Sequence, residues 1–143
     1  MYGLVKLAKT QPSRQKVFLG GTCNDSQWRD QLIPLLAIDY FDPVVDDWTE
    51  AAQQEEIKQR ETCDYCLYVI TPKMAGVYSI AEVIDDSNKR PAKTIFCVLP
   101  KDERETYTKE QKKSLDEVGN MVKKNGGQFF TDLHDVAEFL NGK

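Results

Sequence analysis

Several features that would point to particular protein classes are missing from this 143-residue chain. The chain has one histidine, His134. We therefore expect neither a zinc site of the usual cysteine and histidine spacing nor a histidine-based catalytic triad. The chain has no run of 18 apolar residues and no signal peptide, which predicts a cytoplasmic protein that does not bind membranes. With 19 basic and 23 acidic residues its net charge is -4, so binding to a nucleic-acid polymer is not expected.

Cysteine is also scarce, yet two of the four cysteines form a Cys63-Asp-Tyr-Cys66 pair. Such a pair can be a redox motif, in which a helix N-terminus lowers the pKa of the first thiol. Here the pair follows a predicted helix and leads into a predicted strand. Buried free thiols are therefore the preferred interpretation.

What the chain does have is an alternation of short apolar runs with longer amphipathic segments. We expect residues 16–143 to form one α/β domain, with a five-stranded parallel sheet covered by helices on both faces. The expected fold is flavodoxin-like or Rossmann-like, with strand order 2-1-3-4-5. Residues 1–15 show no clear period and are predicted to be an extended N-terminal arm. The predicted strands are 16–20, 37–41, 64–71, 93–99 and 127–130, and the predicted helices are 25–35, 49–62, 77–89, 107–124 and 132–141.

Residues at the predicted boundaries fit this alternation. Asp25 or Ser26 is expected to cap the first helix, Thr49 to cap the second, and Asn125-Gly-Gly to end the fourth. The segment 101–110 is almost wholly polar and is predicted to be a mobile loop.

The segment after the third predicted strand places a glutamate, Glu82, just inside a helix. Ligands of parallel α/β sheets bind at the carboxyl ends of the strands, where such a loop lies. Apolar positions at helical spacing are expected to pack on the sheet, with Glu82 and Asp86 together on a different face. The alternative is an ordinary solvated acid, with Asp85 or Asp86 paired to Lys89.

Loops after the first two strands should lie at the same edge of the sheet. The first, Gly20-Gly-Thr-Cys-Asn-Asp25, has no Walker or dinucleotide-binding spacing, and its glycines fit plain turn geometry as well as ligand binding. The second contains Asp46, Asp47 and Trp48, which suit a sugar or base, although acids are also favoured at a helix N-terminus. In the next helix Glu56 lies four residues before Arg60, where a surface ion pair is the simpler interpretation.

Three pieces of sequence carry a resemblance to a known family. They are Val17-Phe-Leu-Gly-Gly-Thr22, Cys63-Asp-Tyr-Cys-Leu-Tyr-Val-Ile-Thr-Pro72 and Gly76-Val-Tyr-Ser-Ile-Ala-Glu-Val83. Over about residues 16–141 the chain resembles the nucleoside 2-deoxyribosyltransferase family, most closely its compact "like" branch. The resemblance implies cleavage or transfer at the N-glycosidic bond of a (deoxy)nucleoside or nucleoside 5′-monophosphate through a covalent glycosyl-glutamate. It implies no metal or other cofactor, and assembly as a homodimer or higher homo-oligomer.

The resemblance also assigns roles to residues of this chain. Glu82 is similar to the family's nucleophile, and Glu56 lies where the family keeps a carboxylate that can act as the general acid. The implied substrate-binding set joins the first loop (Gly20, Gly21, Thr22 and Asn24), the second loop (Asp46, Asp47 and Trp48) and the start of the third helix (Gly76, Tyr78 and Ser79).

The chain departs from the family pattern near the sugar. Well-studied members carry an aspartate six residues before the nucleophile, and Gly76 stands there in this chain. The usual strand-one aromatic is Phe18, which has no hydroxyl. A non-catalytic nucleotide-binding module, such as a sensor or a phage accessory protein, is therefore the alternative hypothesis.

Overall fold

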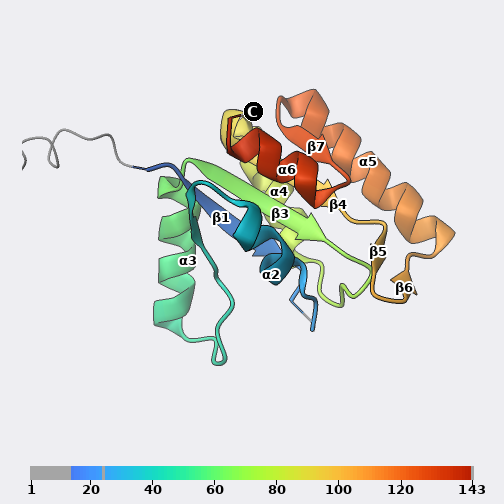
Figure 1. Ribbon diagram of the computed structural model, residues 1–143, viewed down its shortest axis with the longest axis horizontal. Coiled ribbons are helices and arrows are strands. Elements are labelled where there is room, and N and C mark those ends of the chain that lie inside the picture. The colour runs from blue at the N-terminus through green and yellow to red at the C-terminus, as the bar shows by residue number, and fades with distance from the viewer. Residues whose placement is uncertain (1–13, 24, 143) are drawn as a thin grey trace, which may run out of the picture.

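The computed structural model describes residues 14–23 and 25–142, and these form an α/β domain around a parallel sheet (Figure 1). The order β2-β1-β3-β4-β7 confirms the predicted order, the fifth parallel strand being β7. The predicted arm over residues 1–15 lies outside the described residues except for Arg14 and Gln15. The strands of the sheet are β1 (Lys16–Gly21), β2 (Asp39–Phe41), β3 (Tyr65–Ile70), β4 (Thr94–Val98) and β7 (Gln128–Phe130).

Helices cover both faces of this sheet, as the alternation predicts. In Figure 1, α2 and α6 lie in front of the sheet and α4 lies behind it. No helix in the described part of the chain is long and apolar enough to cross a membrane. The helices are α2 (Trp28–Leu32), α3 (Glu50–Thr62), α4 (Tyr78–Lys89), α5 (Lys109–Asn125) and α6 (Leu133–Leu140), with short 3-10 turns at Ile33–Leu35 and Pro91–Lys93.

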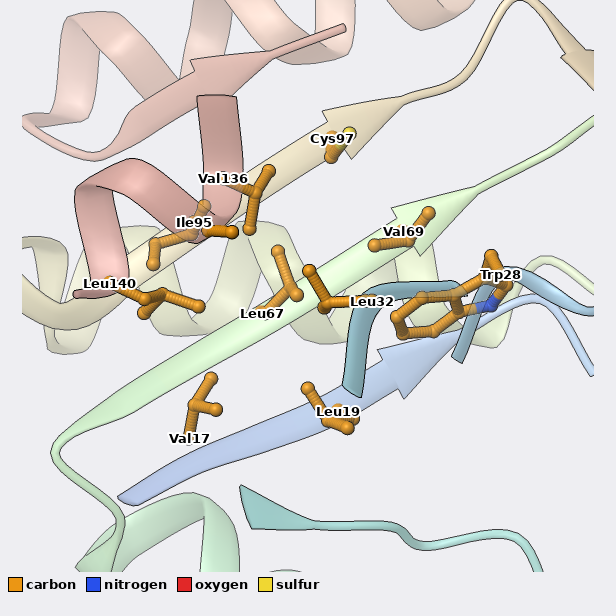
Figure 2. Packing of buried hydrophobic residues seen from close by; sticks show 11 residues of the cluster. Val17, Leu19, Trp28, Leu32, Leu67, Val69, Ile95, Cys97, Val136 and Leu140 are labelled. Carbon is orange, nitrogen blue, oxygen red and sulfur yellow. The ribbon is translucent and has the colours of Figure 1, made fainter. Parts of the chain in front are cut away.

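The buried side chains fall into two clusters, one on each face of the sheet. Alternate residues of one strand point to opposite faces, so Val17 and Leu19 belong to one cluster while Phe18 belongs to the other. Figure 2 shows the first cluster, in which side chains of α2 and α6 lie over those of β1, β3 and β4. The second cluster lies under α4 and α5 and includes Tyr68, Val83 and Leu115.

Two of the predicted helix boundaries are confirmed and one is wrong. Thr49 caps α3 by accepting a hydrogen bond from the Ala52 N–H, and Gly126 ends α5 with a φ of 107°. The first helix begins only at Trp28, and neither Asp25 nor Ser26 caps it. Asp25 has a φ of 61°, which is incompatible with an N-cap, and the Ser26 hydroxyl donates to Asp102 instead.

The polar segment predicted as a mobile loop is also more ordered than expected. It contains a short antiparallel pair, β5 (Lys101–Asp102) and β6 (Glu105–Thr106), and a capping box at Thr108 that starts α5. Lys73 ties this hairpin to the rest of the protein through ion pairs with Asp102 and Glu103. The hairpin itself is a local pairing of residues 101–106, but the ion pairs that attach it to the protein come from Lys73, which is distant in sequence.

Candidate active site

Three loops meet at the carboxyl edge of the sheet, as the strand order predicts, and enclose a cavity of about 290 Å³. Apolar side chains make up much of its wall, and carboxylates of two different helices, Glu56 of α3 and Glu82 of α4, reach it. The lining residues are Phe18, Gly20, Gly21 and Cys23, then Arg29 of α2, then Pro43, Val44, Val45 and Trp48 between β2 and α3, then Glu56, Tyr78, Ser79 and Glu82.

The two glycines at the end of β1 are required by packing. Gly21 has a φ of +124°, and a Cβ there would lie 2.0 Å from the carbonyl oxygen of Val69 on β3. A Cβ on Gly20 would lie 2.8 Å from the ring of Tyr68. The close approach of β1 to β3 therefore explains both glycines, and it leaves bare backbone facing the cavity.

A second hollow of about 160 Å³ adjoins the cavity and shares Gly21, Cys23, Tyr78 and Ser79 with it. Thr22 lines this hollow, although its hydroxyl already accepts a hydrogen bond from the Thr71 N–H at 3.0 Å. Gly76 lies there too, and no heavy atom lies within 4 Å of where its Cβ would be. The hollow therefore has room beside Gly76 for a larger side chain or for part of a ligand.

The structure brings together most, but not all, of the predicted site residues. Asp46 and Asp47 line neither the cavity nor the hollow, and Asn24 lies outside the described residues. The cavity lining contains seven of the predicted residues: Gly20, Gly21, Trp48, Glu56, Tyr78, Ser79 and Glu82. Thr22 and Gly76 line the adjoining hollow.

Sequence reasoning missed Arg29, whose guanidinium reaches the cavity from α2. It donates hydrogen bonds to the carbonyl oxygens of Leu19 and Thr22 and lies 3.5 Å from a carboxylate oxygen of Asp42. Arg29 thereby links the end of β1 to the loop after β2. An arginine in the first turn of a short helix carries no sequence signal for such a role.

Glu82 is 6% exposed and lies beside Glu56, which changes its ionisation. Burial raises the pKa of Glu82 to about 8, and a hydrogen bond with Glu56 and the charge of Glu56 act in the same direction. Glu82 is therefore held in its protonated form at neutral pH by burial and by the neighbouring carboxyl group. The simpler interpretation of Glu56 is wrong, since no ion pair within 4 Å joins it to Arg60 in the described region.

Arg60 instead turns toward α4, where it contacts three carboxylates. Its Nη1 lies 3.6 Å from Glu82 Oε2, and its Nη2 lies 3.4 Å from Asp85 Oδ2 and 3.0 Å from Asp86 Oδ1. Lys89 pairs with Asp85 at 3.1 Å, so the predicted helix-surface pair does exist. This surface pair does not involve Glu82 or Asp86, both of which are buried.

Asp86 is 0% exposed, which corrects the expectation that it and Glu82 share a face turned away from the packed side of the helix. The Tyr68 hydroxyl donates to its Oδ2 at 2.5 Å, and Arg90 Nη2 donates to its Oδ1 at 2.5 Å. Burial alone raises the pKa of Asp86, yet the hydrogen bonds from Tyr68, Arg60 and Arg90 lower it below its usual range. Asp86 is therefore an ionised carboxylate inside the protein.

The two cysteines of the Cys63-Asp-Tyr-Cys66 pair are buried free thiols, as the preferred interpretation expects. Cys63 follows the last residue of α3, and Cys66 lies in β3. Burial raises the pKa of Cys63 and raises that of Cys66 to about 12, which opposes thiolate formation. Among residues 14–23 and 25–142, no group of three or more His, Cys, Asp or Glu side chains is placed to hold a metal ion.

Residues 14–102 match the family described as "Nucleoside 2-deoxyribosyltransferase like". The chain belongs to this family. In this nucleoside 2-deoxyribosyltransferase-like protein, the matched stretch runs from the start of β1 to β5 and includes every residue of the cavity lining. A comparison with curated proteins gives no match, and neither does a comparison with solved structures.

Proposed function

We propose that this protein cleaves or transfers at the N-glycosidic bond of a (deoxy)nucleoside or nucleoside 5′-monophosphate. The family supports an enzyme that acts on nucleosides, and one observation carries the mechanism. Glu56 and Glu82 come from different helices and both line the cavity, and burial together with the neighbouring Glu56 raises the pKa of Glu82 to about 8. Glycosidic chemistry uses such a pair, one carboxylate as nucleophile and one carboxylic acid as proton donor.

In the proposed reaction an oxygen of ionised Glu82 attacks the anomeric carbon of the sugar. The carbon–nitrogen bond breaks, its electron pair stays with the base, and Glu56 gives its proton to the departing base. A water molecule or a second base then attacks the anomeric carbon and displaces the Glu82 carboxylate, and Glu56 takes up the proton that the attacking group loses. This chemistry needs no metal or redox cofactor.

The cavity suits such a substrate in size and in character. Its 290 Å³ is close to the lower limit of about 300 Å³ for small-molecule sites. Phe18, Val44 and Trp48 offer apolar and aromatic surface for a base. Val77, the N-cap of α4, provides no side-chain cap, so a 5′-phosphate placed in the adjoining hollow would meet a helix N-terminus that favours an anion.

The test is release or exchange of free base from a panel of deoxynucleosides and their monophosphates, measured by chromatography with and without a second base. Glu82→Gln should lower the rate on the order of 10⁴-fold or more, and Glu56→Gln by about 10² to 10⁴-fold. Glu55→Gln is the matched control, because Glu55 is an exposed glutamate next to Glu56 on α3. Full activity of Glu82→Gln would exclude the mechanism.

A second candidate, a nucleotide-binding module without turnover, is favoured by Gly76. This position, where well-studied members of the family hold the sugar with an aspartate, has no side chain and opens onto empty space. The same panel separates the two candidates. Binding of a nucleotide to the wild-type protein without any free base or exchanged nucleoside would support the module.

Assembly as a homodimer or higher homo-oligomer is part of the proposal. Exposed apolar and aromatic side chains surround the mouth of the cavity, and a second copy of the chain would cover them. They include Val44, Val45, Trp48, Val77 and Tyr78.

A further inference from the structure

The proposed reaction needs the negative charge on Glu82 and the proton on Glu56, and two neighbouring glutamates do not by themselves set that order. The structure surrounds them unequally. Arg60 Nη1 lies 3.6 Å from Glu82 Oε2, whereas no ion pair within 4 Å joins Arg60 to Glu56 in the described residues. The guanidinium therefore stabilises an ionised Glu82 more than an ionised Glu56.

Arg60 is held in this place by the buried carboxylate of Asp86. Its Nη2 donates to Asp86 Oδ1 at 3.0 Å, and the same carboxylate accepts from Tyr68 and Arg90. The Arg60 side chain is 13% exposed, so bulk water screens its charge only weakly.

The charges around Asp86 do not cancel. Two guanidiniums, those of Arg60 and Arg90, pair with the single negative charge of Asp86. These three groups therefore carry a net charge of +1. Asp85 lies 3.4 Å from Arg60, but its side chain is 44% exposed and is also paired with Lys89. Of the two guanidiniums, Arg60 is the one that lies within 4 Å of Glu82.

The charged groups near Glu82 come from several elements, and Arg29 of α2 lines the same cavity. Helix α3 brings Glu56 and Arg60, α4 brings Asp86, and β1 brings the uncharged Phe18 and Gly20, while Tyr68 of β3 hydrogen-bonds to Asp86. Burial, Glu56 and Asp86 oppose ionisation of Glu82, and Arg60 favours it. Glu82 Oε2 is buried and has no hydrogen-bond partner within the described part of the chain, so it is free to accept a closer contact from Arg60.

We propose that Arg60 is a positioning residue that favours transfer of the proton from Glu82 to Glu56 by stabilising the Glu82 carboxylate. This inference rests on the proposed function and gives each glutamate its role. The proton crosses the hydrogen bond from Glu82 to Glu56, Arg60 closes on the resulting carboxylate, and Glu82 then attacks while Glu56 holds the proton that the base receives.

The inference is tested by titrating Glu82 directly, a measurement that does not require the protein to be catalytically active. Protein labelled with ¹³C at the glutamate side-chain carboxyl carbon is followed by NMR over pH, and the Glu82 signal is assigned by its loss in Glu82→Gln. Arg60→Met should raise the midpoint of the Glu82 titration by about 1 to 3 pH units, the effect of removing an opposite charge at this range. Arg60→Lys should restore at least part of that change.

Arg90→Met is the matched control, because it removes a guanidinium from the same Asp86 carboxylate without removing a contact to Glu82. Its effect on the Glu82 midpoint should be less than half that of Arg60→Met. An unchanged midpoint in Arg60→Met, or an equal change in Arg90→Met, would overturn the inference.

A second variant leaves Arg60 in place, in case Arg60→Met does not fold. Glu56→Gln should lower the Glu82 midpoint, because the opposing acid is gone while Arg60 remains; no change would overturn the inference. Failure of the wild-type protein to release base from any nucleoside would count against the proposed function alone, since the titrations do not depend on turnover.

Discussion

The two faces of the sheet differ in the kinds of side chain that they bury. Under α2 and α6 the buried cluster is wholly apolar, with Trp28, Leu32 and Leu67 among its largest members (Figure 2). Under α4 the apolar cluster is interrupted by Asp86, which is bonded to Tyr68 and two arginines. Buried charge is not confined to this face, because Arg29 of α2 is 7% exposed, but the second face holds the network of Asp86, Arg60 and Arg90 beside Glu82.

The difference has an energetic meaning. An apolar cluster gains stability from each side chain removed from water, about 25 cal/mol per Å² of apolar surface. A buried ion pair seldom improves on apolar residues of the same shape, because desolvation offsets the attraction. Asp86 and Arg60 are therefore better explained by what they do to Glu82 than by a gain in stability.

The largest effect that tests this comparison should come from Asp86→Ala. The change leaves two largely buried guanidiniums and the Tyr68 hydroxyl without their common partner, and breaking a buried pair in this way costs about 3–5 kcal/mol. Urea denaturation measures the loss. Lys89→Ala is the control on the same helix, since its exposed pair with Asp85 should be worth less than about 0.5 kcal/mol. Equal losses in the two variants would mean that the second face is no different from the surface.

A smaller effect should be a change in the stability of the protein with pH, in a direction set by Glu82. The folded state raises the pKa of Glu82 from 4.5 to about 8, so between these values the native protein binds more protons than the unfolded chain. Stability contributed by Glu82 is therefore present at low pH and is lost as the pH rises through the folded pKa.

Glu82→Gln cannot lose a proton, so its stability relative to wild type should rise from pH 5 to pH 9. One pKa unit corresponds to about 1.4 kcal/mol, and a change of at least that size is expected. Urea denaturation at several pH values measures it, with Glu55→Gln as the control that should run parallel to wild type. Parallel curves for Glu82→Gln would show that Glu82 ionises normally in the folded protein.

The fold was predictable because the information for it is local. The apolar runs around Leu67 and Phe96 identify buried strands, and Thr49 and Gly126 mark helix ends by their own backbone and side-chain chemistry. The start of α2 was not predictable in this way. Ser26 is a good capping residue by type, but its hydroxyl is used by Asp102, which is distant in sequence.

The site was predictable only in part, for a related reason. Helical spacing placed Glu82 and Asp86 on one face of α4 correctly, but it could not show that α3 covers this face and brings Arg60 to it. Glu56 and Arg60 lie four residues apart on the same helix, so their spacing suggested that they pair with each other. The partners of Glu56 and Arg60 are set by contacts between α3 and α4. The sequence pattern of a single helix carries no information about such contacts.

The smallest effect should come from the apolar face and should not depend on pH. Ile95 is 1% exposed in β4 and belongs to the cluster under α2 and α6, so Ile95→Val should lower the free energy of unfolding by about 0.5–1.5 kcal/mol. Urea denaturation at pH 5 and pH 9 should give the same loss, because the cluster around Ile95 contains no group that changes its charge between these values. The comparison between the faces would fail if this loss changed with pH as that of Glu82→Gln does, since charge on the second face would then act across the whole sheet.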